Sequence, residues 1–167
     1  GDLSVGAPKH EWTSGTDRGA VYVFSGATGA QLGKLGGNND GDQLGWAVTG
    51  VPDVNLDGVG DHAFSKPWGD SGALSDCGVV YIYSGASPAT FLRSYTGAAN
   101  GDHFGFSIDG MQDTNADGRG DLLIGAPQTD AAGIFDSGRG YRASGATSGV
   151  VLATYSGSTF AGWFSHS

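Results

Sequence analysis

The sequence predicts an all-β fold built from repeated four-stranded units, and three observations support this. Landmarks recur at intervals of 59 and 60 residues, as Tyr22, Tyr81 and Tyr141 show. Segments rich in β-branched and aromatic residues alternate with Gly, Asn, Asp and Ser clusters, and no segment has a helical period of useful length. An acidic loop of one pattern occurs twice, at residues 53–61 and 113–121. A fixed period of this size indicates a solenoid, a propeller or an array.

Each repeat has room for four strands. The third of these in the middle copy reads VVYIY, a composition that favours a strand. Four strands per repeat match one blade of a β-propeller. For the middle copy we expect strands at residues 44–50, 61–66, 78–84 and 90–96.

The repeat boundaries predict about three blades in a single propeller region. Two blades are complete in the sequence, and the third is split between the termini. Residues 2–36 supply its second, third and fourth strands, and FAGWFSH at residues 160–166 resembles its first. The predicted blade pieces are residues 1–43 with 157–167, residues 44–103, and residues 104–156.

The two acidic loops carry oxygen side chains at their first, third, fifth and ninth positions, and the backbone carbonyl of the seventh residue can add another oxygen. Calcium accepts six to eight oxygen ligands in flexible geometry, whereas magnesium needs a stricter octahedron. A solvated Asp/Asn/Gly turn is the alternative, but a second copy in register counts against it. We therefore expect about two calcium ions per chain. Their predicted ligands are Asp53, Asn55, Asp57, Val59 and Asp61 in one loop, and Asp113, Asn115, Asp117, Arg119 and Asp121 in the other.

The loop does not end as an EF-hand does. An EF-hand has a bidentate Glu at its twelfth position, and that position here is Ile124. The segment after the loop, LLIGAP, predicts a short buried strand, so the ion is expected between two strands. The same loop contains the tripeptide Arg119-Gly120-Asp121. Because Asp121 is a predicted ligand, we do not expect this tripeptide to act as a cell-adhesion ligand.

These residues resemble FG-GAP repeats, the units of the integrin α-subunit β-propeller. The resemblance rests on Phe104-Gly105, on the Asp-x-Asn-x-Asp-Gly-x-Gly-Asp loop and on Gly-Ala-Pro at residues 125–127. It implies calcium in the hairpin between the first two strands of a blade. Two departures stand out, namely HAFSKPW at residues 62–68 and Arg142, which is expected to interrupt a third strand. Gly1-Asp2 looks like the end of a third loop.

Composition excludes several classes of function. The formal net charge is −9, and only eight basic residues are present, which gives no electrostatic footprint for nucleic acid. No apolar run is long enough to span a bilayer. The single cysteine, Cys77, cannot form an intrachain disulfide, and we expect a small unreactive residue at a loop end. An intermolecular bridge or a reactive thiol is the alternative. Exposed calcium loops favour the outside of a cell or its surface.

Catalysis is not predicted, because the sequence shows neither a nucleophile elbow nor a zinc-spaced histidine pair. Its histidines are His10, His62, His103 and His166. A carbohydrate-binding propeller needs exposed aromatic residues once per blade. Of the tryptophans Trp12, Trp46, Trp68 and Trp163, only Trp46 keeps the repeat period, and we expect it to be buried in a first strand.

The sequence therefore predicts a non-catalytic, calcium-stabilised extracellular propeller module for protein interaction, adhesion or assembly. A lectin-like propeller and a propeller fragment of a larger secreted enzyme are the alternatives. Three blades fall below the usual four to eight in a ring. We therefore expect either self-association of two chains or closure within a longer parent chain.

Overall fold

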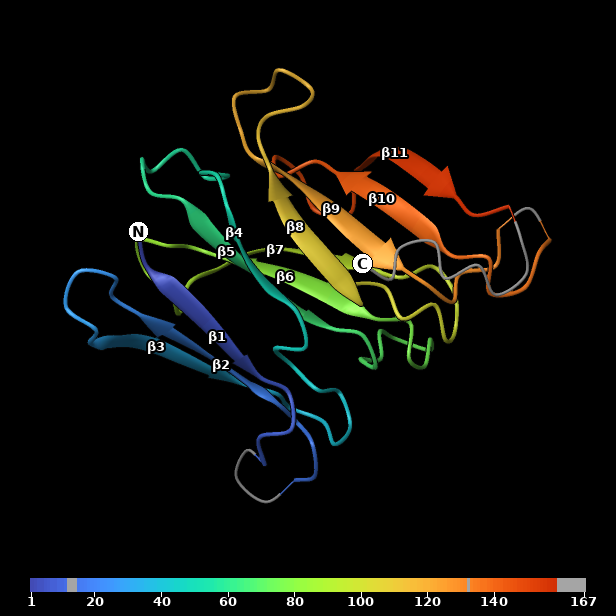
Figure 1. Ribbon diagram of the computed structural model, residues 1–167, viewed down its shortest axis with the longest axis horizontal. Helices are drawn as coiled ribbons and strands as arrows, with labels where there is room; N and C mark the ends of the chain where they lie inside the picture. The colour runs from blue at the N-terminus through green and yellow to red at the C-terminus, as the bar shows by residue number, and fades with distance from the viewer. Residues whose placement is uncertain (12–14, 132, 159–167) are drawn as a thin grey trace.

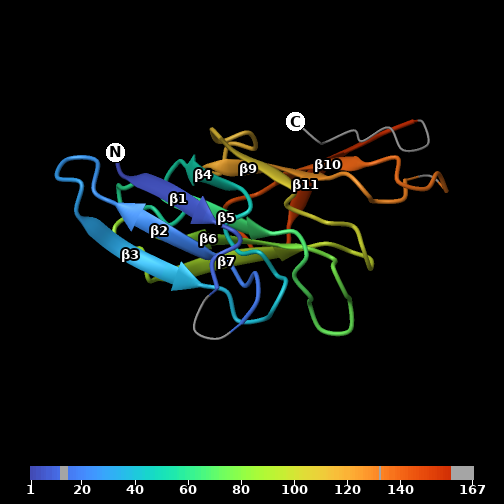
Figure 2. The same ribbon diagram turned by 60° about the horizontal axis from the view of Figure 1, so that its bottom comes forward.

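The computed structural model describes residues 1–11, 15–131 and 133–158, and in these ranges every regular element is a β-strand. The described ranges form two antiparallel sheets of four strands and one of three. Figure 1 shows the sheets side by side in chain order, coloured blue, then teal to green, then yellow to red. The all-β repeat fold predicted from the sequence is confirmed, and the three sheets form an arc that does not close into a ring (Figure 2).

The first sheet has the order β1-β2-β3 and contains three strands. They are β1 (Leu3–Ala7), β2 (Ala20–Phe24) and β3 (Gln31–Gly36). By their place in the repeat these are the second, third and fourth strands of a blade, as predicted for residues 2–36. The segment predicted to supply the missing first strand, residues 160–166, lies outside the described residues.

The second and third sheets are complete four-stranded blades with simple up-and-down order. The second contains β4 (Val48–Val51), β5 (Asp61–Lys66), β6 (Val79–Tyr83) and β7 (Phe91–Thr96). The third contains β8 (Ser107–Met111), β9 (Asp121–Ala126), β10 (Arg139–Ala143) and β11 (Val151–Ser156).

The prediction that the first strand begins at residue 44 was wrong. Residues 44–47 precede β4 in a turn, because Gln43 and Gly45 have φ angles of 55° and 86°, outside the range of a strand. A side chain at Gly45 would also meet the carbonyl oxygen of Ala20 at 2.5 Å. Trp46 consequently does not lie in a buried strand, and it is 37% exposed.

The hydrophobic core is concentrated where neighbouring sheets face each other. Phe64 packs with Val21, Val23 and Leu44 between the first two sheets. A larger cluster joins the second and third sheets and includes fully buried Val54, Ile82 and Leu122. β4 packs against both β1 and β8, so the first strands of the complete blades lie next to each other. Burial of these apolar side chains between the sheets stabilises the packing of neighbouring blades against each other.

The two departures from the repeat pattern leave the strands intact. Arg142 does not interrupt its strand, since β10 pairs with β9 on both sides of it. The register shift of β10 against β11 next to Arg142 recurs after Val23 and after Ile82, so it belongs to the repeat rather than to this arginine.

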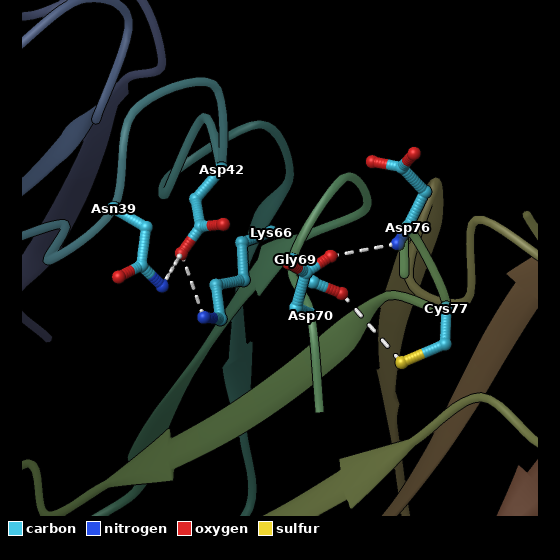
Figure 3. Close-up of polar contacts among 7 residues, drawn as sticks. All are labelled: Asn39, Asp42, Lys66, Gly69, Asp70, Asp76 and Cys77. Carbon is cyan, nitrogen blue, oxygen red and sulfur yellow. Dashed lines mark hydrogen bonds and ion pairs between the residues drawn. The ribbon is translucent and has the colours of Figure 1, made fainter. Parts of the chain in front are cut away.

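The middle copy keeps its packing through a buried ion pair. Lys66 stands where the third copy has Ala126, and its Nζ lies 2.8 Å from Oδ2 of Asp42 (Figure 3). Asn39 donates its side-chain amide to the same oxygen at 3.1 Å. Burial alone would lower the pKa of Lys66, but the hydrogen bond to Asp42 and the neighbouring Tyr81 raise it above its usual value. The strand that carries Lys66 is buried along its whole length.

Cys77 is a buried free thiol, as expected for a small structural residue. Its Sγ lies 3.6 Å from the carbonyl oxygen of Gly69 (Figure 3). Burial raises the pKa of the thiol, which disfavours the reactive thiolate.

Candidate metal loops

The first acidic loop, residues 52–60, connects β4 to β5. Asp53 organises it by accepting hydrogen bonds from the loop's own amides. Its Oδ1 accepts from the amides of Asn55 at 3.1 Å and Asp57 at 3.2 Å, and its Oδ2 accepts from Gly58 at 2.7 Å. Leu56 and Gly58 have φ angles of 65° and 88°. This left-handed turn is uncommon for a non-glycine residue and wraps the loop around the carboxylate.

Asp61 closes the loop from the start of β5 and is 1% exposed. Its Oδ2 accepts the amide of Val54 at 2.8 Å, and its Oδ1 accepts the amide of Gly85 at 3.0 Å. Burial is the largest influence on this carboxyl and raises its pKa. The nearby charges of Asp57 and Asp53 act in the same direction, against the two amide hydrogen bonds. A cation in the loop would offset this crowding of negative charge.

The second acidic loop, residues 112–120, joins β8 to β9 and repeats these contacts. Asp113 accepts the amides of Asn115 at 3.1 Å, Asp117 at 3.2 Å and Gly118 at 2.6 Å. The amide of Gly118 contributes most to lowering the pKa of Asp113. Asp121 is fully buried and accepts the amides of Thr114 and Gly145. The two loops therefore share one architecture.

Eight of the ten predicted ligands lie in these two loops, between the first and second strands of a blade, and the other two, Asp61 and Asp121, are the first residues of β5 and β9. The seventh residues, Val59 and Arg119, donate their amides to Oδ1 of Asp57 at 2.9 Å and of Asp117 at 3.0 Å. The side-chain amides of Asn55 and Asn115 donate to the same two aspartates, to Oδ2 at 2.8 Å. The third- and fifth-position side chains are thus already in contact.

Among the described residues, no three carboxylate, imidazole or thiol side chains converge closely enough to hold a metal ion. In each loop the first- and ninth-position carboxylates accept hydrogen bonds from backbone amides. The donor set nevertheless fits a hard cation, because it consists of carboxylate, amide and carbonyl oxygens.

Sequence reasoning missed two hydroxyl groups at these loops. Ser84 and Ser144 each donate Oγ to Oδ2 of the fifth-position aspartate, Asp57 or Asp117, at 3.3 Å. Both serines belong to a Ser-Gly-Ala segment that recurs with the repeat period, which is the signal that could have identified them. The glycine of each segment is the amide donor to the closing acid.

The interpretation of Gly1-Asp2 as the end of a third loop agrees with the structure. Oδ1 of Asp2 accepts the amide of Gly26 at 3.1 Å, which is the contact that Asp61 makes with Gly85. A side chain at Gly26 would meet the carbonyl oxygen of Gly1 at 1.8 Å, and one at Gly85 would meet that of Gly60 at 1.9 Å. Asp2 therefore occupies the ninth position of this motif.

The tripeptide Arg119-Gly120-Asp121 is not displayed for recognition. Asp121 is 0% exposed, Gly120 is buried and Arg119 is partly buried. A receptor that reads this tripeptide needs its carboxylate, and that carboxylate is held by the amides of Thr114 and Gly145. The burial of this carboxylate agrees with the expectation that the tripeptide does not act as an adhesion ligand.

The described histidines do not form a catalytic group. His62 is buried and bonds through Nδ1 to Oγ of Ser4 at 2.8 Å, and its ring stacks on Phe64. His103 lies against Trp68, with ring centroids 5.5 Å apart. His10 contacts Tyr22 edge to face. The remaining histidine, His166, lies outside the described residues.

The aromatic residues near Trp46 form a cluster that spans two blades. Trp46 lies edge to face on Trp68 at 4.6 Å and contacts Phe106 at 5.3 Å, and its indole Nε1 donates to the carbonyl oxygen of Phe106 at 3.2 Å. Trp12 and Trp163 lie outside the described residues.

Several known proteins have sequences similar to this chain. The chain is 33% identical over 156 residues to integrin alpha-PS2 of Drosophila melanogaster, covering 81% of the chain and 11% of that protein. It is 29% identical over 152 residues to integrin alpha-V of Gallus gallus, covering 80% and 14%. It is 31% identical over 178 residues to phosphatidylinositol-glycan-specific phospholipase D of Bos taurus, covering 96% and 19%. No protein-family model matches the chain.

Four-stranded antiparallel blades, each with an acidic loop between its first two strands, define the class of the molecule as a repeat protein of the β-propeller type. The similarity to several integrin α subunits identifies the family within this class. The chain is an FG-GAP repeat protein related to the integrin α-subunit β-propeller. It spans about a tenth to a fifth of the length of the relatives named above.

Proposed function

We propose that the chain is a calcium-stabilised, non-catalytic propeller module that acts in adhesion or assembly outside the cell. The observation that carries the calcium assignment is the repeated loop. The same pattern of Asp, Asn, Asp and buried Asp is folded with the same hydrogen bonds at residues 53–61 and 113–121. Turn propensity alone does not require a buried carboxylate that closes each loop.

Calcium would be structural in these loops. Asp53, Asp57 and Asp61 would supply carboxylate oxygens in the first loop, Asn55 an amide oxygen and Val59 its carbonyl. The cation would neutralise three carboxylates that otherwise repel one another. At a calcium concentration a hundred times the dissociation constant, each site adds about 2.7 kcal/mol to the free energy of unfolding. That is a large share of the stability of a typical domain.

The test is calorimetric titration of the chelator-treated chain with calcium. Two sites are expected, and Asp57→Asn and Asp117→Asn are each expected to remove one. Asp109→Asn is the matched control, since Asp109 lies on β8 outside both loops. Magnesium is expected to restore the melting temperature poorly, because its strict octahedron suits these loops less well. Unchanged binding in both loop variants, or equal rescue by magnesium, would refute the assignment.

The adhesion or assembly role rests on relatedness to integrin α subunits, and an extracellular or cell-surface location rests on the same relatives. Among the described residues no helix has the length and apolar character to cross a membrane. The similarity to phospholipase D enzymes favours a second candidate, in which this module is the propeller segment of a larger enzyme. In both cases the module itself is proposed to lack catalysis. Release of product from a phosphatidylinositol-glycan substrate by this chain alone would contradict that.

An open strand edge supports the association proposed for the chain. Within the described residues β1 pairs only with β2, and Leu3 and Val5 on β1 are 58% and 42% exposed. Beside this edge is a groove of about 750 Å³, whose far side is formed by β4. We propose that a strand equivalent to β4 or β8 fills it, from a longer parent chain or from a second copy. An unpaired edge of this kind favours pairing with another strand.

A further inference from the structure

The two acidic loops contact each other directly. The amide of Gly120 in the second loop lies 3.4 Å from the carbonyl oxygen of Asp53 in the first. Gly120 is buried, and a side chain there would lie 2.7 Å from the carbonyl oxygen of Pro52. Its counterpart in the first loop, Gly60, is exposed. The second loop therefore rests, backbone against backbone, on the first.

Arg119 makes a second connection through its side chain. Nη1 of its guanidinium donates to the carbonyl oxygen of Val54. Arg93, from the same blade as Val54, donates Nη2 to the same oxygen at 3.1 Å. The amide of Val54 in turn donates to Oδ2 of Asp61, and its side chain is fully buried between the sheets. The Val54 peptide is thus held both by the closing acid of the first loop and by the arginine of the second.

The backbone of Arg119 belongs to the second candidate site. Its amide donates to Asp117, and its carbonyl is a predicted ligand. The equivalent residue of the first loop is Val59, which is 42% exposed and has no hydrogen-bond donor in its side chain. Sequence reasoning assigned a role only to the carbonyl of Arg119, because Val54 lies 65 residues earlier in the chain.

We propose that Arg119 is a positioning residue that couples the two loops, so that a calcium ion in the first loop strengthens calcium binding in the second. The inference rests on the proposed function, since it presupposes that both loops bind calcium. An ion in the first loop fixes Asp61 and Asp53, which fixes the peptide carbonyls that Arg119 and Gly120 contact. The second loop then loses less conformational freedom when it binds its own ion.

The test is a cycle of four chains, namely the parent, D57N, R119V and the double variant, titrated with calcium in the calorimeter. The D57N substitution replaces one proposed ligand carboxylate of the first loop with an amide of nearly the same size. It is expected to weaken calcium binding at the second loop by about fivefold or more, the lower end of typical coupling between sites. In the R119V background, which gives the second loop the residue of the first but keeps the Gly120 contact with Asp53, D57N is expected to weaken the second loop much less than in the parent chain.

Arg93 supplies the matched control. R93M removes the other guanidinium from the Val54 carbonyl but leaves the contact between loops, so the coupling should persist. R119V leaves that carbonyl paired with Arg93, so no buried acceptor is orphaned. R119Q, which removes the guanidinium and shortens the side chain, repeats the comparison with a polar residue. The melting temperature of each chain with and without calcium provides a second readout of the same coupling.

The outcomes separate the two proposals. Two sites in the parent chain that bind independently, or coupling of undiminished strength in both R119V and R119Q, would overturn the role proposed for Arg119 and leave the calcium assignment intact. Absence of calcium binding in the parent chain would overturn both.

Discussion

Removing the Lys66 ammonium should destabilise the chain more than any surface substitution. The Lys66→Met variant keeps an apolar side chain of similar length but removes the ammonium group. Of the two side chains that now contact the buried Asp42 carboxylate, only the Asn39 amide then remains. The side chains of Lys66 and Asp42 are only 10% and 4% exposed, so solvent screens the pair little. Removing one member of a buried pair costs about 3–5 kcal/mol. For a chain of this size that lowers the melting temperature by about 6–20 °C.

The measurement is thermal and urea unfolding of four chains, namely the parent, Lys66→Met, Asp42→Asn and the double variant. The double variant should recover much of the loss, because a buried ion pair can be replaced by neutral groups at little net cost. Lys9→Met, at an exposed lysine, is the control and should change stability by less than about 0.5 kcal/mol. A loss below about 1 kcal/mol in Lys66→Met, or a double variant that shows the sum of the single losses, would refute the reasoning.

The ion pair also predicts a response to pH. The pKa of Lys66 is raised above its usual value of 10.5, so its contribution is complete below that pH. It is lost as the pH rises through the folded-state pKa. The parent should therefore lose its advantage over Lys66→Met only in strongly alkaline solution.

Three further outcomes are expected. Gly145→Ala places a side chain 1.8 Å from the carbonyl oxygen of Gly120, so it should lower the melting temperature and weaken calcium binding in the second loop. Gly50→Ala is the control and should do neither, because there is open space around Gly50. Equal melting temperatures of the two variants would contradict the close approach at Gly145. The thiol of Cys77, which is 0% exposed, should react with a thiol reagent only at the rate of unfolding, and rapid modification of the native chain would show that it is accessible. Light scattering at micromolar concentration should show a species larger than 16.8 kDa, and a well-folded monomer would contradict self-association of this chain.

The repeat period allowed much of the fold to be predicted. Tyr22, Tyr81 and Tyr141 mark the same position in three copies, and the loops at 53–61 and 113–121 lie where the pattern places them. The beginning of the first strand was mispredicted because periodicity does not reveal the positive φ of Gln43 and Gly45. That turn also explains why Trp46 is partly exposed rather than buried.

Contacts between copies were beyond sequence reasoning. Lys66 looked like a defect in a repeat that otherwise carries Ala, and its partner Asp42 lies 24 residues earlier in the segment between β3 and β4. The contact of Arg119 with Val54 spans 65 residues. A repeat pattern predicts the strands and loops that all copies have in common. It does not predict contacts made by residues that occur in one copy only, such as Lys66 and Arg119.

The aromatic cluster gives the junction of the second and third blades an optical signature. Trp46 precedes β4 and Trp68 follows β5, while the first acidic loop joins the opposite ends of these strands. The fluorescence emission of Trp46 and Trp68 therefore depends on whether the two blades stay together, because the Trp46 indole donates a hydrogen bond to the Phe106 carbonyl across the junction. A chain with Phe in place of Trp12 and Trp163 would emit from this junction alone. In such a chain, stopped-flow fluorescence would time the separation of one pair of blades, independently of the rest of the molecule.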